Sequence, residues 1–152
     1  MAEREFGAGF DPTGFVIRPL PNTQFMRDNS SWIFRGVTLN PMFWPARRQE
    51  TLLTTAVYRF HPGFAGEDYD VWLGDLDGDT ADQGLATLEG GDVMPIGRGV
   101  VVIGMGERSS HQAITQVARN LFAAGEAEST LPQIQGIPVW IFLIQLHTHA
   151  YH

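Results

Sequence analysis

The stretch Thr87-Leu88-Glu89-Gly90-Gly91-Asp92-Val93 lies at the centre of the chain's organisation, and Gly104-Met105-Gly106-Glu107-Arg108-Ser109-Ser110 follows it closely. Residues 93–103 are apolar around a Gly-Arg-Gly turn, which predicts a hairpin of two buried strands. Glu89 stands before the first strand, and Arg108 stands after the second, just ahead of a predicted helix. The acid Glu89 and the base Arg108 at the ends of adjacent strands predict a functional site. The alternative is a glycine-rich turn with a solvated acid.

The two glycines that follow Glu89 have a physical reason of their own. Glycine lets the backbone take positive φ or approach a ligand closely. A bulky side chain at Gly90 or Gly91 would therefore crowd whatever Glu89 reaches.

Length and composition indicate one globular domain. The chain has 152 residues, of which 43% are hydrophobic and 18% are charged, and this argues against disorder. The formal net charge of −7 argues against a nucleic-acid or anionic-membrane partner. Because the sequence has no cysteine, it offers no disulfide, thiolate metal site or cysteine nucleophile. Neither a signal-like opening nor an apolar run of membrane-spanning length occurs, so we expect a cytoplasmic protein.

The N-terminal part of the chain predicts an arm followed by short strands. Residues 1–21 mix glycine, proline and aromatic residues without periodicity, which is typical of a loop or a docking arm. Asp28 lies in a polar cluster, where capping a turn is the commoner use of an aspartate. Residues 32–39 predict one strand, or two short strands that pivot at Arg35-Gly36.

A helix is predicted over residues 45–60. Pro45 suits its first turn, and the triplet His61-Pro62-Gly63 ends it. Apolar residues recur at helical spacing at Leu52, Leu53, Ala56, Val57 and Phe60. Arg47 and Arg48 fall in the first turn, where the helix macrodipole disfavours cations. That placement suggests an anionic ligand or partner, with a solvated pair as the alternative.

The C-terminal part repeats the same kinds of element. Residues 69–73 predict a short strand, and residues 74–84 predict an acidic solvent loop that lacks the closing glutamate of a calcium loop. Ser109 or Ser110 caps a predicted helix that ends at Gly125. The buried face of that helix is predicted at Ala113, Val117, Leu121 and Phe122. Residues 138–144 predict a buried strand.

Three histidines close the chain, at positions 147, 149 and 152. Their spacing could place them on one side of a strand as zinc ligands, but no nearby acid completes such a site. Strand–strand–helix units thus recur twice, around residues 32–60 and 93–122. This repetition is consistent with an α/β fold, a propeller of short modules around a central pocket.

Several short motifs occur in this sequence in the same order as in arginine deiminases, which the chain resembles over about residues 10–128. They are Leu20-Pro21-Asn22, Phe25-Met26-Arg27-Asp28-Asn29-Ser30, Asn40-Pro41-Met42, Pro45-Ala46-Arg47-Arg48-Gln49-Glu50, Leu88-Glu89-Gly90-Gly91-Asp92 and Gly106-Glu107-Arg108. The resemblance implies an α/β-propeller, the pentein or guanidino-group-modifying fold. It also implies hydrolysis of L-arginine to L-citrulline and ammonia, without a metal or organic cofactor.

By this resemblance, the acidic residues are catalytic and hold the guanidinium group of the substrate. Asp28 would bind the guanidinium, and Glu89 would hold its other edge while orienting a catalytic histidine. Phe25 would lie against the flat face of the guanidinium group, and Asp92 resembles a structural partner in the same motif. Carboxylates suit this role because they match the planar N–H forks of a guanidinium with paired, charge-assisted hydrogen bonds.

The basic residues would hold the other end of the same ligand. By the resemblance, Arg47 and Arg108 would clamp the α-carboxylate of L-arginine, and Asn22 would assist. An arginine fork matches a carboxylate geometrically. Such a pocket would reject peptidyl arginine, which lacks the free carboxylate.

The sequence departs from the family at the reacting groups. In the family a cysteine thiolate attacks the guanidinium carbon and a histidine moves protons. This chain has no cysteine and no His-Leu-Asp-Thr motif, and from about Ser129 it no longer resembles the family. We therefore expect three segments: an arm over residues 1–21, deiminase-like propeller modules over 22–128, and a divergent tail over 129–152.

We therefore interpret this chain as a fragment or frameshifted copy of an arginine deiminase. It would hold the substrate-binding half, with L-arginine as its small-molecule partner. The alternative is a non-catalytic arginine-binding or interaction module on the same fold. A metal-dependent hydrolase using the terminal histidines ranks below both. Homo-oligomerisation is left open.

Overall fold

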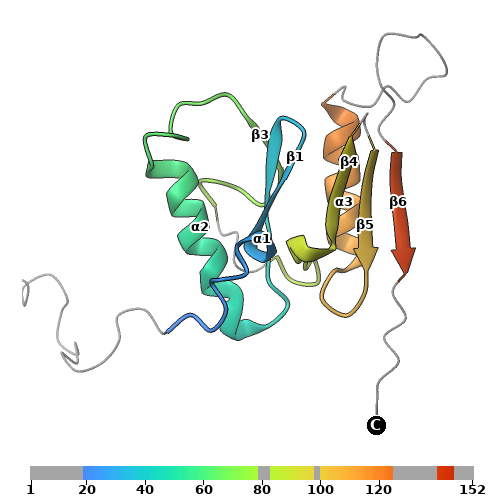
Figure 1. The fold of residues 1–152 in the computed structure, drawn as a ribbon, viewed down its shortest axis with the longest axis horizontal. Coiled ribbons are helices and arrows are strands. Elements are labelled where there is room, and N and C mark those ends of the chain that lie inside the picture. The colour runs from blue at the N-terminus through green and yellow to red at the C-terminus, as the bar shows by residue number, and fades with distance from the viewer. Residues whose placement is uncertain (1–18, 79–82, 98–99, 125–139, 146–152) are drawn as a thin grey trace, which may run out of the picture.

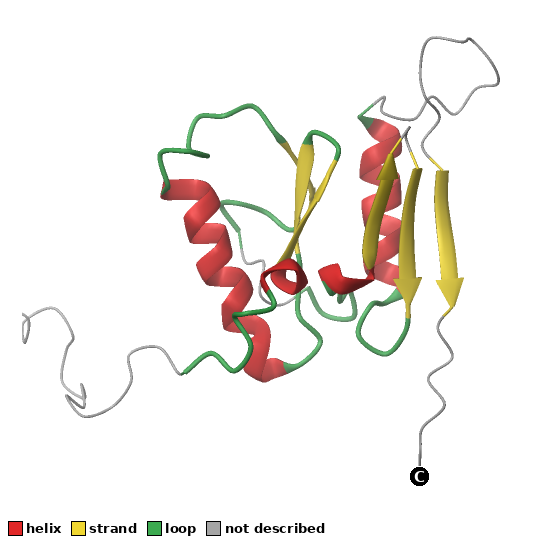
Figure 2. Ribbon diagram, in the orientation of Figure 1, coloured by secondary structure: helices red, strands yellow, loops and turns green. Residues whose placement is uncertain are grey.

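Two three-stranded sheets, each associated with a long helix, form the part of the chain that the structure describes (Figures 1 and 2). This structure is a computed structural model, and it describes residues 19–78, 83–97, 100–124 and 140–145. Short helical turns stand at the ends of the strands: α1 (Met26–Asn29), η2 (Pro45–Arg47) and η3 (Gly90–Asp92).

The first unit begins with a hairpin and closes with a crossover. Strands β1 (Ser30–Ile33) and β2 (Gly36–Leu39) pair antiparallel, so the prediction of two short strands is confirmed. Helix α2 (Arg48–Phe60) follows, and β3 (Asp70–Leu73) then pairs parallel with β2. A parallel neighbour requires a crossover connection, and α2 provides it.

The second unit repeats this order. Strands β4 (Val93–Gly97) and β5 (Val100–Met105) form the predicted hairpin, helix α3 (His111–Ala123) follows, and β6 (Trp140–Gln145) pairs parallel with β5. The Ser110 side chain accepts the backbone N–H of Ala113 at 3.3 Å, so Ser110 is the helix cap. The predicted repetition of strand–strand–helix units is therefore confirmed.

The main core lies between the two sheets, and α3 contributes to it (Figure 1). Its buried members include Ile33 and Leu73 from the first unit and Ile103, Val117 and Leu121 from the second. Hydrogen bonds tie the same elements together. Trp72 donates from its indole to the Ile33 carbonyl at 2.8 Å, and Asn120 of α3 donates to the Trp72 carbonyl at 2.8 Å. The two units are thus packed through a shared apolar layer.

The buried face of α2 is not the face that its apolar spacing marks. The spacing correctly predicts a helix, but its large apolar side chains are exposed, from 39% for Leu53 to 70% for Phe60, and Ala56 is half-buried. The side chains that α2 buries are instead Glu50, Thr51, Thr55 and Tyr58. Tyr58 packs with Val37 and Leu39 of β2, and the two threonines donate to backbone carbonyls. Polar groups can occupy this face because each has a hydrogen-bond partner.

Several predictions fall outside the described residues. These are most of the arm over residues 1–21, the helix end at Gly125, most of the tail over 129–152 and the three terminal histidines. The proposed segment boundaries remain predictions. Among the described residues, no helix combines the length and the apolar character needed to cross a membrane.

Candidate functional site

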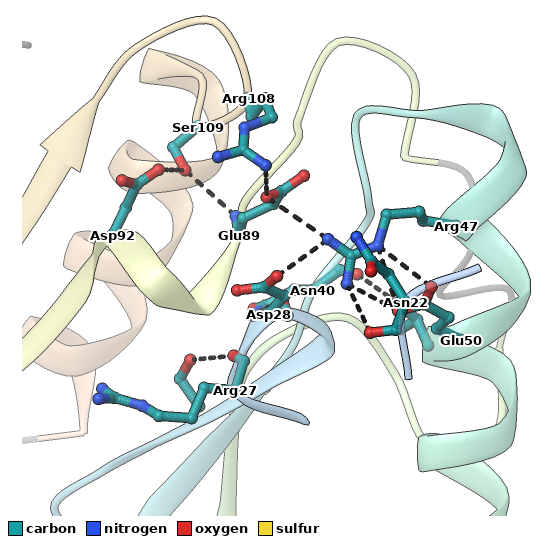
Figure 3. Close-up of polar contacts among 12 residues, drawn as sticks. Asn22, Arg27, Asp28, Asn40, Arg47, Glu50, Glu89, Asp92, Arg108 and Ser109 are labelled. Atoms are coloured by element: carbon teal, nitrogen blue, oxygen red, sulfur yellow. Dashed lines mark hydrogen bonds and ion pairs between the residues drawn. The ribbon is translucent and has the colours of Figure 1, made fainter. Parts of the chain in front are cut away.

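Charged side chains from both units meet where the ends of their strands approach each other (Figure 3). Asp28 lies on α1, Arg47 on η2 and Glu50 in the first turn of α2. Glu89 precedes η3, and Arg108 follows β5. We call these five residues the charged cluster. It contains three carboxylates and two guanidinium groups, so its formal charge is −1.

Asp28 is held in place by the end of β2. The amide of the buried residue Asn40 donates to the Asp28 carbonyl at 2.8 Å, and the Asn40 backbone N–H donates to the Asn29 carbonyl at 2.9 Å. Thr51 of α2 donates in turn to the Asn40 carbonyl at 2.5 Å. The short helix α1 is therefore fixed to the sheet and to α2 at once.

Glu89 is held by the loop that follows β5. Its backbone N–H donates to the hydroxyl of Ser109 at 3.1 Å, and that hydroxyl donates to an Asp92 carboxylate oxygen at 2.5 Å. Ser109 is fully buried. The hydroxyl thus bridges the residues on either side of the two glycines. This contact gives Asp92 the structural part that the resemblance implies for it.

The two glycines serve different purposes. A Cβ at Gly90 would collide with the Arg27 carbonyl oxygen and with the Ser31 hydroxyl, so Gly90 permits the close approach of α1 to η3. A Cβ at Gly91 would lie 3.2 Å from a carboxylate oxygen of Asp28. The second position therefore adjoins Asp28, an acid of the predicted site.

Arg47 is buried at the centre of the charged cluster, so the interpretation of a solvated pair is wrong for this residue. Its Nη1 lies 2.9 Å from an Asp28 oxygen and 3.8 Å from a Glu89 oxygen. Its Nε and Nη2 both bond to Glu50, at 3.1 Å and 2.8 Å. The bond to Glu50 and, less strongly, the bond to Asp28 raise the pKa of Arg47, while burial lowers it.

Glu89 has one paired and one unpaired oxygen. Its side chain is 3% exposed, and Oε2 lies 2.6 Å from Nη1 of Arg108. Its Oε1 is buried without a hydrogen-bond partner in the described part of the chain. Burial raises the pKa of Glu89, opposed by the nearby charges of Arg108 and Arg47. A buried oxygen without a donor is uncommon in folded proteins, so this oxygen keeps an unused capacity to accept a hydrogen bond.

The remaining predicted site residues lie at the edge of the charged cluster. The Arg108 side chain is half exposed. Asn22 approaches Arg47 through its backbone carbonyl, which is 3.5 Å from Nη2. The Phe25 side chain is 52% exposed and immediately precedes α1. The structure therefore brings Asp28, Glu89, Arg47 and Arg108 together, with Asn22 beside them and Phe25 toward solvent.

Sequence reasoning missed two members of this arrangement. From the sequence, Glu50 is only the last residue of a motif that resembles the family, and Ser109 is only a candidate helix cap. For Glu50 the available signal was its position three residues after Arg47, which places the two side chains on one helix face. For Ser109 no local signal existed, because its partners lie 17 and 20 residues away in sequence.

Comparisons with known proteins give a family and a fold for the chain. A family model described as arginine deiminase matches residues 8–140. Among solved structures, a dimethylarginine dimethylaminohydrolase adduct with 4-chloro-2-hydroxymethylpyridine superimposes with a TM-score of 0.56 and 21% identity, covering 85% of this chain and 41% of that one. DDAH from Pseudomonas aeruginosa, as a mutant complexed with citrulline, gives a TM-score of 0.55 and 19% identity, covering 85% and 40%.

These matches establish the architecture. The chain spans about two fifths of the length of the solved structures that it resembles, with 41% and 40% covered in the two cases. Their likeness shows that the two units are modules of the α/β-propeller, or pentein, fold. Within the described residues, no group of three or more histidine, aspartate or glutamate side chains is arranged to hold a metal ion.

Proposed function

The chain belongs to the arginine deiminase family, and we propose that it is the substrate-binding half of an arginine deiminase. It binds L-arginine, and the reaction to which this binding contributes is hydrolysis of L-arginine to L-citrulline and ammonia. Asp28 and Glu89 hold the guanidinium group of the ligand. Arg108 and Arg47, with Asn22, hold its α-carboxylate.

The observation that carries this proposal is the convergence of Asp28 and Glu89. They are 61 residues apart and belong to different units, yet both carboxylates approach Nη1 of Arg47, at 2.9 Å and 3.8 Å. A guanidinium nitrogen is therefore already the group on which they converge. The free Oε1 of Glu89 and the formal charge of −1 on the charged cluster leave it suited to one more cationic donor.

The other end of the ligand is assigned to the basic residues. Arg108 is half exposed, so its guanidinium can turn from Glu89 toward an incoming carboxylate. The ligand carboxylate would then take the place of Glu89 as the anionic partner of Arg108. We therefore expect the site to prefer L-arginine over agmatine, which has the guanidinium but lacks the carboxylate.

Binding can be tested by isothermal titration calorimetry of the purified chain with L-arginine. Asp28→Asn and Glu89→Gln should each weaken binding by about thirtyfold or more, because truncating one partner of a buried charged pair costs about 2 kcal/mol or more. Glu67→Gln is the matched control, since Glu67 is exposed and outside the charged cluster. Equal affinities for all four proteins would refute the assignment.

The carboxylate assignment has its own test. Agmatine should bind the wild-type chain at least tenfold more weakly than L-arginine, since it offers Arg47 and Arg108 no anion. In Arg108→Ala the two affinities should approach each other. Equal affinity of the wild-type chain for both ligands would mean that the arginines are misassigned.

A second candidate function is a non-catalytic arginine-binding module, and the absence of cysteine favours it. The guanidinium carbon is stabilised by resonance and needs a strong nucleophile that an adjacent base activates. We expect the 152-residue chain alone to form no citrulline over several hours, measured against a full-length homologue. Citrulline formation that Glu89→Gln abolishes would contradict this expectation and require a nucleophile other than cysteine.

A further inference from the structure

We propose that Glu50 is a positioning residue that holds Arg47 by one edge and thereby sets the ligand preference of the charged cluster. This inference rests on the proposed function, because it concerns the site to which L-arginine is assigned. It adds a residue that touches no ligand and acts through Arg47.

In the described part of the chain, the hydrogen bonds of the Glu50 side chain all go to one edge of the Arg47 guanidinium. Its side chain has no exposed surface. One oxygen accepts from Nε of Arg47 at 3.1 Å, and the other accepts from Nη2 at 2.8 Å and from Nε at 3.3 Å. This is the side-on fork by which an arginine binds a carboxylate. That edge of Arg47 is therefore occupied by the protein itself, as Figure 3 shows.

The remaining edge of Arg47, formed by Nη1 and Nη2, is directed by this contact. Nη1 lies 2.9 Å from Asp28, and Nη2 lies 3.5 Å from the Asn22 carbonyl. An incoming carboxylate can therefore meet Arg47 only through these two nitrogens. Because Glu50 is anchored on α2, it decides where that edge points.

Glu50 also limits how closely Arg47 approaches the two other acids of the site. Nη1 is bonded to Asp28 but remains 3.8 Å from Glu89. If Arg47 lost its anionic partner on the other edge, the two remaining carboxylates would attract it further into the cluster. It would then compete with a ligand guanidinium for Asp28 and Glu89, and its edge would no longer face a ligand carboxylate.

A purely structural role for Glu50 is the contrasting explanation. An acid in the first turn of a helix is stabilised by the macrodipole, and Glu50 occupies such a position in α2. That role depends on the charge alone. The positioning role depends on the reach of the carboxylate, which must span both Nε and Nη2.

The experiment compares two variants that separate charge from reach. Glu50→Gln keeps the length and removes the charge, while Glu50→Asp keeps the charge and withdraws the carboxylate by one methylene. Glu67→Gln is the control. The Nε–H resonances of ¹⁵N-arginine-labelled protein report the Arg47 contact without a ligand, and calorimetry gives the affinities for L-arginine and agmatine.

We expect both Glu50 variants to shift the Arg47 Nε–H resonance and to weaken L-arginine binding by about tenfold. Agmatine binding should weaken less, by about threefold, because agmatine makes no use of the Arg47 edge and is affected only by the competition of Arg47 for Asp28 and Glu89. The ratio of the two affinities therefore falls. If Glu50→Gln does not fold, Glu50→Asp decides the matter, since it retains the charge at the start of the helix.

Four outcomes would contradict the proposal, and they are distinguishable. An unshifted Arg47 resonance in the variants overturns the positioning itself. A shifted resonance with an unchanged ratio of affinities leaves only the helix-charge role. The same holds if Glu50→Gln changes the resonance and the affinities but Glu50→Asp does not. If the wild-type chain binds neither ligand, the proposed function fails, and the ligand preference fails with it, while the resonance still decides whether Glu50 holds Arg47.

Discussion

Replacement of Ser109 by alanine is the sharpest test of how the Glu89 segment is held. The hydroxyl of Ser109 donates to the Asp92 carboxylate at 2.5 Å and accepts the Glu89 backbone N–H at 3.1 Å. A hydrogen bond to a charged group contributes about 1.5–3 kcal/mol and a neutral one about 0.5–1.5 kcal/mol. Because Ser109 is fully buried, water does not replace its bond to the Glu89 N–H, whereas the half-buried Asp92 carboxylate can still reach water. We expect the free energy of unfolding to fall by about 2–4 kcal/mol.

This loss can be measured by urea unfolding, followed through tryptophan fluorescence with Trp72 in the core as a reporter. Ser31→Ala is a matched control. Ser31 is also buried, but within the described residues its hydroxyl makes one neutral bond, to the Arg27 carbonyl at 3.3 Å. That variant should lose about 1 kcal/mol or less. If Ser109→Ala lost no more than Ser31→Ala, the reasoning that the hydroxyl secures Glu89 and Asp92 would be refuted.

Two further predictions concern the same segment. Gly90→Ala should destabilise the protein by more than about 2 kcal/mol, because its Cβ would collide with the backbone of α1, whereas Gly106→Ala, with open space around its Cβ, should be nearly neutral in the same urea assay. Arginine binding should also depend on pH. Burial raises the pKa of Glu89 above its ordinary value of 4.5, and the carboxylate form binds the guanidinium. Affinity should therefore fall as pH drops through a range above that of an exposed glutamate, and Glu89→Gln should remove this dependence in calorimetry at several pH values.

The secondary structure follows mainly from local chemistry, and the sequence predicts most of it. The hairpin of β4 and β5 follows from apolar runs around a glycine turn, and the Ser110 cap follows from a hydroxyl ahead of an apolar helical pattern. The order of elements in each unit then favours the propeller. The resemblance to a family added the candidate acids and bases, which no spacing rule could connect across 61 residues between Asp28 and Glu89.

Tertiary contacts decided the rest, because they join segments that local patterns cannot relate. The apolar spacing of α2 predicted a helix, yet the sheet and Asn40 select its polar face for burial, since Thr51 and Tyr58 find partners there. The sequence likewise placed Arg47 at an unfavourable helix start. Only the fold supplies the reason, which is Glu50 on one edge and Asp28, 19 residues away, on the other. A buried arginine is stable only where several carboxylates converge on it, and that convergence is a property of the tertiary structure.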